Sequence, residues 1–405
     1  MNGGAVRMRT AFPLTRRRSI PSMKPKLKPY CRHVMSLGDG VIRFKMERAS
    51  LEIPDPEGTV HAFVRLLDGT RTIAELSQEA GLTLGDTEDA VALLDRHRLL
   101  EAESTEPSAL TERELVRYKN NLTYFSLHES LTNSRYDCQV KLKNAKVAVV
   151  GLGGGSVIAA WLAAMGVGTI VGVDCDRVEL NNLNRQFFYT EKDVGEYKTV
   201  ALKRRLEELN GDIRVEAVQL KVDSAASLLQ AISGADFVVG AIDTPPLLGS
   251  RYVNSACLHL NIPAYYVSIG NKLGFYYRVD PTESGCTDCR LLHIMRTEPE
   301  LLETTKRKWN RAEPDADFGN PGFAPNVAVI TSLIASEIAK RLTGYGEPFP
   351  MPFGLIDFQG MSVSHRNIPK ADDCPSCGRG RPPEGPEPVP MEKLFALAES
   401  GVPAG

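Results

Sequence analysis

A glycine-rich turn near residue 150 constrains the fold of this chain more than any other feature of its sequence. The apolar run at residues 145–150 leads directly into Gly151-Leu152-Gly153-Gly154-Gly155-Ser156, and a helical pattern follows. Glycines in such a turn let a phosphate group approach the backbone, and free N–H groups at the start of the helix attract negative charge. The segment therefore predicts the first strand, turn and helix of a nucleotide-binding α/β fold.

The region after this turn alternates short apolar β-rich runs with helical patterns. The runs lie at residues 145–150, 169–173, 213–218, 237–241 and 265–267. Such alternation is typical of a doubly wound parallel sheet, so we expect a Rossmann-like α/β domain. Asp174 follows the second run, where a carboxylate can hold ribose hydroxyls, and this feature alone suits NAD as well as ATP.

The polar residues that come next favour ATP over NAD. Arg185 can bind phosphate oxygens through its guanidinium, Asn182 can hydrogen-bond them, and Lys198 supplies another cation. Asp243 follows the fourth run, at the carboxyl edge of the sheet, where it can hold Mg²⁺ between phosphates. We predict Asp243, Arg185 and Lys198 as catalytic residues. The predicted cofactor-binding residues are Gly151, Gly153, Gly154, Asp174, Asn182, Arg185, Lys198 and Asp243.

Four of the eight cysteines form two spaced pairs. Cys286-x-x-Cys289 and Cys374-x-x-Cys377 are separated by 84 residues. Four thiolates suit a tetrahedral Zn²⁺ with no open position, which predicts a structural zinc site and not a redox motif. We interpret the scattered cysteines as packing residues: Cys31, Cys138, Cys175 and Cys257.

Residues 29–104 are predicted to form a small α+β domain. Gly38-Asp39-Gly40 lies between two β-rich runs and suggests a hairpin, and Leu51 with Ile53 could form a third short strand. Three helical segments follow, one of them opened by the capping box Thr72-x-x-Glu75. Strands followed by three helices indicate a winged-helix arrangement.

The composition excludes several classes of protein. The chain has 405 residues, 24% charged and 42% hydrophobic, with a formal net charge of −2. We therefore expect no nucleic-acid partner, and no apolar run is long enough for a membrane span. The basic N-terminus lacks the apolar core of a secretory signal, so we expect a cytoplasmic protein. Outside the two domains we expect a disordered tail at 1–28 and a Pro-rich tail at 379–405 with one short amphipathic turn at 391–398. The α/β domain is expected at 105–378.

These features together resemble the E1-like (ThiF/MoeB) adenylating enzymes. Besides the nucleotide residues and the cysteine pairs, the resemblance rests on residues 141–146 before the glycine turn and on Phe323-Ala324-Pro325 before a long helix. It covers about residues 115–378. Within the superfamily the chain looks most like the MccB-type peptide-adenylating enzymes. Residues 67–76, Leu-Asp-Gly-Thr-Arg-Thr-Ile-Ala-Glu-Leu, resemble a PqqD-like module that recognises the leaders of ribosomally made peptides.

The resemblance implies an ATP- and Mg²⁺-dependent enzyme that joins a carboxylate to AMP. It implies that Asp174 holds the ribose, that Asn182, Arg185 and Lys198 hold the phosphates, and that Asp243 binds Mg²⁺ and assists the attack on the α-phosphate. The glycine loop departs from the family pattern GxGGxGS, being one residue shorter.

The resemblance also implies a homodimer. Family members carry an Arg-Tyr-x-Arg motif on an N-terminal helix, and one of its arginines reaches the partner's ATP. Here the motif reads Arg117-Tyr118-Lys119-Asn120, so its second arginine is missing. The long helix expected at 326–343 is more apolar than one amphipathic face requires, which suggests that it forms the dimer contact.

The expected reaction is adenylation of a carboxylate on a precursor peptide whose leader is held by residues 29–104. We expect the leader to add as a strand beside Leu51 and Ile53, in a groove lined by Leu93 and Leu94, and other maturation enzymes are possible partners. Residues 290–325 hold no cysteine, which argues against a thioester step. Two alternatives stay open: a non-catalytic leader-binding partner, and activation of a sulfur-carrier protein.

Overall fold

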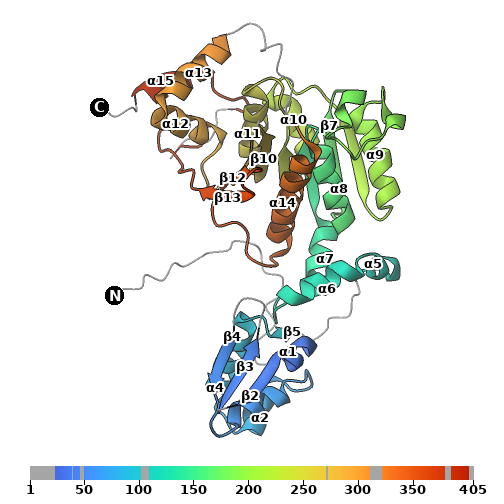
Figure 1. The fold of residues 1–405 in the computed structure, drawn as a ribbon, viewed down its shortest axis with the longest axis vertical. Helices are drawn as coiled ribbons and strands as arrows, with labels where there is room; N and C mark the ends of the chain where they lie inside the picture. Colours follow the sequence, from blue (N-terminus) through green and yellow to red (C-terminus); the bar gives the residue numbers. More distant parts are fainter. Residues whose placement is uncertain are drawn as a thin grey trace. The chain divides into compact units, whose positions relative to one another are not determined.

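The computed structural model describes residues 23–38, 40–45, 50–101, 109–270, 272–310, 322–378 and 385–400. The chain divides into two compact units (Figure 1). The first contains Met1–Ala109 and Leu122–Tyr136, and the second contains Leu110–Asn121 and Asp137–Gly405. Most of the predicted N-terminal tail lies outside the described residues.

The first unit is built on a three-stranded antiparallel sheet with the order β2 (Met35–Gly38), β3 (Val41–Lys45), β4 (Ser50–Pro54). Its register pairs Ile42 with Ile53, so both side chains lie on the same face. The remaining elements are β1 (Lys26–Leu27), α1 (Pro29–Val34), α2 (Thr59–Leu66), α3 (Ile73–Ala80), α4 (Leu84–Arg96) and β5 (Leu100–Glu101). The capping box predicted at α3 is present: the Thr72 side chain accepts from Glu75 N–H, and the Glu75 side chain accepts from Thr72 N–H.

The end of the predicted N-terminal tail is ordered, which corrects the prediction for residues 23–28. Leu27 pairs with Leu100 in a short β1–β5 ladder and is buried in the core of the unit. Lys28 is also buried, and its ammonium donates to the carbonyl of Glu129 at 2.9 Å. Burial lowers the pKa of Lys28 to about 8. The sequence prediction failed here because a lysine-rich segment gives no sign of the distant partners that bury it.

Residues 122–136, which the sequence analysis assigned to the α/β domain, belong to the first unit. Arg135 forms ion pairs with Glu129 at 2.9 Å and with Glu101 at 2.8 Å, and both carboxylates are largely buried. Asp95, on α4, accepts a hydrogen bond from the backbone N–H of Leu131 at 2.9 Å. The unit therefore includes residues 122–136, which are remote in sequence from the rest of it.

The second unit contains an eight-stranded sheet with the order β13-β12-β11-β10-β9-β6-β7-β8. Five strands run parallel: β6 (Lys146–Val150), β7 (Thr169–Asp174), β8 (Arg214–Gln219), β9 (Phe237–Gly240) and β10 (Ala264–Ile269). They coincide with the five predicted runs. The strands β11 (Leu273–Val279), β12 (Phe353–Asp357) and β13 (Ser362–Arg366) extend the sheet antiparallel, which the sequence analysis did not anticipate.

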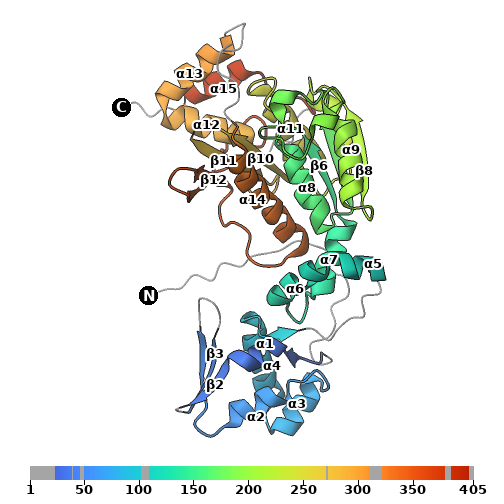
Figure 2. The ribbon, with the colours of Figure 1, turned by 45° about the vertical axis from the view of Figure 1, so that its right-hand side comes forward.

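Helices cover both faces of this sheet (Figures 1 and 2). On one face α8 (Gly155–Met165) packs against α9 (Lys198–Leu209) and α14 (Ala324–Thr343). On the other face α10 (Ala225–Ile232), α11 (Leu248–Leu260) and α12 (Thr287–Thr297) pack in succession. The other helices of this unit are α5 (Glu112–Arg117), α7 (Arg135–Asn144), α13 (Pro299–Asn310) and α15 (Met391–Ser400), while most of α6 (Lys119–His128) belongs to the first unit. Together with the sheet they form the predicted doubly wound α/β fold. Within the described part of the chain, no helix meets the length and hydropathy that crossing a membrane requires.

The long helix α14 is already covered within its own chain. Val327, Ile330, Ile334 and Ile338 are each at most 4% exposed. These four residues were part of the reason for predicting a dimer contact here, and intramolecular packing now accounts for their apolar character. Val329, Leu333 and Leu342 are half-buried.

The C-terminal segment is packed onto the second unit, where the sequence suggested a Pro-rich tail. Both carboxylate oxygens of Glu387 accept N–H groups at the start of α10, from Ala225 at 3.0 Å and Ala226 at 2.8 Å. The helix α15 packs against α12 and α13 (Figure 2). Its buried residues join the main core: Met391, Leu394, Phe395 and Ala398.

We predict that Leu394→Ala destabilises the second unit by about 2 to 5 kcal/mol, because a fully buried side chain leaves a cavity. Chemical denaturation of the full chain measures this change. Lys393→Ala, at the adjacent exposed position of the same helix, is the matched control and should leave the midpoint nearly unchanged. Equal effects of the two variants would show that α15 does not pack as described.

Candidate nucleotide site and metal centre

A cavity of about 650 Å³ lies at the carboxyl ends of the parallel strands β6, β7, β9 and β10. Its volume falls within the usual range for small-molecule sites. All eight residues predicted from the sequence to bind the cofactor line it: Gly151, Gly153, Gly154, Asp174, Asn182, Arg185, Lys198 and Asp243. The fold thus brings together residues spread over more than ninety positions of the sequence.

The glycine turn crosses the ends of β6 and β9 at very close range. Gly151 has φ +91°, and a Cβ built there would lie 2.3 Å from the carbonyl oxygen of Ala241. A Cβ on Gly155 would lie 2.8 Å from Val149 Cγ1, beneath the start of α8. Only glycine therefore fits at Gly151, both for its backbone conformation and for the available space. The open backbone left by these glycines forms the floor of the cavity.

Asp174 is fixed at the end of β7 by two backbone donors. Its Oδ2 accepts from Leu152 N–H at 2.6 Å and its Oδ1 accepts from Asp176 N–H at 2.8 Å. Each carboxylate oxygen retains a further lone pair. The carboxylate is therefore held beside the glycine turn and can still accept from two hydroxyls of a ribose.

Residues 182–186 contribute one cation and two amides to the cavity lining. Arg185 Nη1 donates to the Asn181 carbonyl at 2.9 Å and to Asn184 Oδ1 at 3.1 Å. No carboxylate among the described residues forms an ion pair with Arg185. The Asn182 side chain is buried and accepts from Glu179 N–H through its Oδ1 at 3.2 Å. These contacts fix the segment and leave a guanidinium without a countercharge in the cavity wall.

Gln186 is a member of this site that the sequence analysis did not select. It is only 5% exposed, and its Oε1 has no hydrogen-bond partner among the described residues. A Cβ on Gly153 would lie 3.1 Å from Gln186 Nε2, so the amide lies against the glycine turn. Buried amides need partners, and either orientation of this one presents a polar atom to a ligand on the turn. Together with Arg185 and Lys198, this orphaned group fits a phosphate chain.

Lys198 is the first residue of α9, and its side chain is 9% exposed. Its ammonium lies 3.1 Å from Asp176 Oδ2. Asp243 lines the cavity in the loop between β9 and α11, beside Thr244 and Pro245. Cations and carboxylates thus lie together at the end of one parallel sheet, where they can bind the phosphates of a nucleoside triphosphate and its divalent ion.

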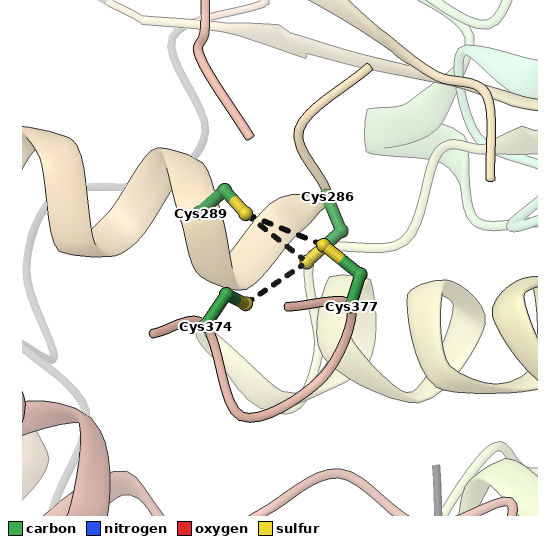
Figure 3. A group of neighbouring side chains, drawn as sticks. All are labelled: Cys286, Cys289, Cys374 and Cys377. Carbon is green, nitrogen blue, oxygen red and sulfur yellow. Dashed lines mark hydrogen bonds between the residues drawn. The ribbon is translucent and has the colours of Figure 1, made fainter. Parts of the chain in front are cut away.

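The four paired cysteines converge at a single point (Figure 3). Their sulfurs lie within 4.8 Å of one another, with Sγ–Sγ distances of 3.9 Å for Cys286–Cys289, 3.7 Å for Cys286–Cys374 and 3.3 Å for Cys289–Cys377. A tetrahedral zinc ion with Zn–S bonds of about 2.3 Å separates its sulfurs by about 3.8 Å. The donor set and its spacing fit such an ion, with no position left for a substrate.

A buried polar network joins the two cysteine pairs. Asp288 lies between Cys286 and Cys289, and its carboxylate accepts from Arg251 Nε at 2.7 Å and from Arg251 Nη2 at 3.1 Å. Ser376, between the other two cysteines, donates to Asp288 Oδ2 at 2.5 Å. Arg251 also donates to the carbonyl of Val389 at 2.6 Å, which ties the C-terminal segment to the cluster. This network has no signal in the sequence, because Arg251 is 37 residues away from Asp288.

Three of the remaining four cysteines match the interpretation as packing residues, and Cys175 does not. Cys31, Cys138 and Cys257 are buried. Burial raises the pKa of Cys257 far above its usual value, which keeps it an inert thiol. Cys175 is exposed and lines the cavity next to Asp174.

The Arg-Tyr-Lys-Asn motif is held within its own chain. Arg117 Nε donates to Asp212 Oδ2 at 2.7 Å, and its Nη1 donates to the Leu209 carbonyl at 3.2 Å. Tyr118 is buried, and its hydroxyl accepts from Asn210 Nδ2 at 2.9 Å. In this chain Arg117 anchors α5 to the end of α9.

Comparison with known proteins identifies the family. The profile of the ThiF family matches residues 125–377. The chain belongs to the ThiF family. It is 31% identical over 277 residues to the sulfur carrier protein ThiS adenylyltransferase of Escherichia coli K12, which covers 66% of this chain and 97% of that protein. It is 34% identical over 275 residues to a sulfur carrier protein adenylyltransferase of Thermus thermophilus, covering 66% and 92%.

Solved structures share the fold. Escherichia coli MccB with ATP superposes with a TM-score of 0.65 at 22% identity, covering 87% of this chain and 99% of MccB. PaaA superposes with a TM-score of 0.58 at 23% identity, covering 70% and 92%. This ThiF-family chain therefore has the E1-like adenylation fold. It is an adenylyltransferase, and enzymes of this class are expected to use ATP.

We predict that purified protein carries about one tightly bound metal ion per chain, held by the four cysteines. Cys374→Ala should lose most of that metal and lower the thermal midpoint, because a structural metal contributes directly to folding. Metal analysis by mass spectrometry checks both. Cys175→Ser, an exposed cysteine outside the cluster, should retain the metal. Metal-free protein with an unchanged midpoint would contradict the prediction.

Proposed function

We propose that this chain adenylates a carboxylate of a ribosomally made precursor peptide while its first unit holds the leader of that peptide. The observation that supports adenylation most is the convergence of Asp174, Arg185, Lys198 and Asp243 around the glycine turn in one cavity. A peptide substrate is supported by the additional first unit. About a third of this chain lies outside the alignments with the sulfur-carrier enzymes, although those alignments cover at least 92% of the relatives.

In this proposal each cavity residue has one task. Asp174 accepts the ribose hydroxyls, while Asn182, Arg185 and Lys198 bind the phosphate oxygens. Bound ATP supplies the adenylyl group that turns a poor electrophile into an activated acid. The positive side chains neutralise charge that builds on the phosphates, and Asp243 positions Mg²⁺, so that catalysis comes mostly from orientation and electrostatics. We further propose that the metal of the cysteine cluster is Zn²⁺ with a purely structural role.

Two elements give the cavity lining an uncharged part. It consists of Val267 and Ile269 at the end of β10, together with Val327, Ile330 and Thr331 of α14. No charged side chain comes from these two elements among the described lining residues. This surface suits an uncharged part of the peptide, next to the carboxylate that attacks the α-phosphate.

In the first unit, β4 is an edge strand suited to leader binding by strand addition. Within the described residues it pairs only with β3. Leu51 and Ile53 are half-buried on the face that also carries Phe44 and Ile42. In the proposal, apolar side chains of the leader pack in a groove beside these two residues. Leu94 is removed from the proposed groove: it is 3% exposed and belongs to the core. Leu93, which is half-buried on α4, stays in it.

The sulfur-carrier alternative has its own support, since the named relatives activate sulfur-carrier proteins at 31% and 34% identity. ATP–pyrophosphate exchange by the full chain separates the possibilities. Exchange stimulated by a precursor peptide supports the proposal, and exchange stimulated only by a sulfur-carrier protein replaces it. Leader binding without any exchange would indicate the non-catalytic partner. The homodimer also remains a proposal, now resting on the half-buried residues of α14.

We predict that Asp243→Asn lowers exchange by about two to three orders of magnitude, because misplaced Mg²⁺ no longer offsets charge on the phosphates. Peptide affinity, measured by calorimetry, should stay unchanged. Asp223→Asn, a carboxamide substitution outside the cavity lining, serves as the matched control. Near-normal exchange by the Asp243 variant would move the metal-binding role to another residue.

We predict that Leu93→Ala weakens binding of the labelled precursor to the full chain roughly tenfold, because a groove residue loses apolar contact with the leader. Fluorescence anisotropy measures the affinity. Ala92→Ser, an exposed neighbour on the same helix, should leave it unchanged. A leaderless peptide that binds the wild-type enzyme as tightly as the complete precursor would refute leader recognition by this unit.

A further inference from the structure

Two short segments form a clasp at the edge of the nucleotide cavity. The clasp comprises residues 176–178, after β7, and residues 195–198, which lead into α9. Their backbones are joined by hydrogen bonds from Val178 N–H to the Glu196 carbonyl at 2.9 Å, from Gly195 N–H to the Val178 carbonyl at 2.8 Å, and from Lys198 N–H to the Asp176 carbonyl at 2.9 Å. Arg177 and Tyr197 face each other across an isolated antiparallel bridge.

The side chains of this facing pair close the clasp. The Arg177 guanidinium carbon lies 3.9 Å from the centroid of the Tyr197 ring, within the range of a cation–π contact. Arg177 Nη1 also donates to the Gly195 carbonyl at 2.7 Å. No ion pair to a carboxylate occupies Arg177 in the described part of the chain, and Arg177 lines the cavity. Its guanidinium is therefore held by a ring face and a carbonyl and not by an opposite charge.

The clasp determines where α9 begins. Tyr197 is the N-cap residue, in extended conformation, and Lys198 is the first helical residue. On the other side of the clasp, Asp176 N–H donates to Asp174 Oδ1 at 2.8 Å, and Asp176 Oδ2 lies 3.1 Å from the Lys198 ammonium. The clasp thus links the carboxylate proposed to hold the ribose to the cation proposed to hold the phosphates.

We propose that Arg177 and Tyr197 are positioning residues that fix the start of α9 and thereby aim Lys198 at the triphosphate. The inference rests on the proposed phosphate-binding role of Lys198. A lysine has a flexible four-carbon stem, so its contribution to binding depends on how much of its freedom is removed beforehand. The stacked pair removes freedom from the backbone that carries this side chain, without itself contacting the phosphates.

The first test is ATP binding by the full chain, measured by calorimetry. Tyr197→Leu and Arg177→Gln should each weaken ATP binding roughly three- to tenfold, the equivalent of one cation–π contact. Tyr197→Phe keeps the ring face and should bind ATP like the wild type. In exchange assays the loss should appear in KM for ATP, with KM for the acyl substrate unchanged. Arg214→Gln, an exposed arginine on β8 outside the cavity, is the control.

A double-mutant cycle with Lys198→Ala tests whether the clasp acts through this lysine. We expect Tyr197→Leu to cause no further loss of ATP affinity once Lys198 is absent. A full additional loss would overturn the inference, because the clasp would then act by direct contact or by general destabilisation. Unchanged ATP binding by Tyr197→Leu alone would also overturn it.

These outcomes are distinct from a failure of the proposed function. Wild-type protein that binds no ATP would reject the nucleotide site itself. If wild-type protein binds ATP and Lys198→Ala weakens that binding while the clasp variants do not, only the inference about the clasp fails. If Lys198→Ala binds ATP normally, the phosphate role of Lys198 fails and the inference fails with it.

Discussion

The close approach of the glycine turn to the neighbouring strand is the constraint on which the nucleotide site depends. Gly151 passes so near the Ala241 carbonyl that no side chain fits between them. This contact lets β6 and β9 lie next to each other with their ends open, and it places the first turn of α8 beside the end of β7. Asp174, bonded to Leu152 N–H within the turn, is fixed by the same geometry. The open backbone at the glycine turn is therefore a consequence of strand packing, and side chains supply the charges and the apolar lining of the cavity.

Buried polar groups hold the distant parts of the second unit to this framework. Arg251 is 1% exposed and donates hydrogen bonds to two groups. One is the carboxylate of Asp288, which lies between two of the cysteines, and the other is the Val389 carbonyl of the C-terminal segment. Removing Arg251 or Asp288 would leave the other buried charge unpaired, which costs more than the pair itself contributes. The cysteine cluster, α12 and α15 therefore behave as one structural block. That block lies on the face of the sheet covered by α10 and α11, away from the α8–α14 layer.

The sequence predicted the parallel part of the sheet well because each buried strand carries its own apolar run and is followed by a distinct turn. All eight residues that it selected for the cofactor line the cavity, since they lie at or beyond the carboxyl ends of parallel strands that share one edge of the sheet. It missed Gln186, which lies against Gly153 of the glycine turn. It also missed Arg177 and Tyr197, which contact each other across the clasp. It also missed β11 to β13, although β11 follows its partner β10 closely and β13 follows its partner β12 closely; only the pairing of β12 with β11 joins strands that are distant in the sequence.

By itself the sequence determined the fold class, the glycine turn, the cysteine pairs and the order of the nucleotide residues, because these follow from local spacing and residue chemistry. Only the tertiary structure decided which residues are buried by distant parts of the chain. Leu94 became a core residue, residues 23–28 became ordered, and the short amphipathic turn expected at 391–398 became a helix packed into the core of the second unit. Burial depends on what packs from elsewhere, and a segment with weak local preference acquires its structure from partners that its own residues do not specify.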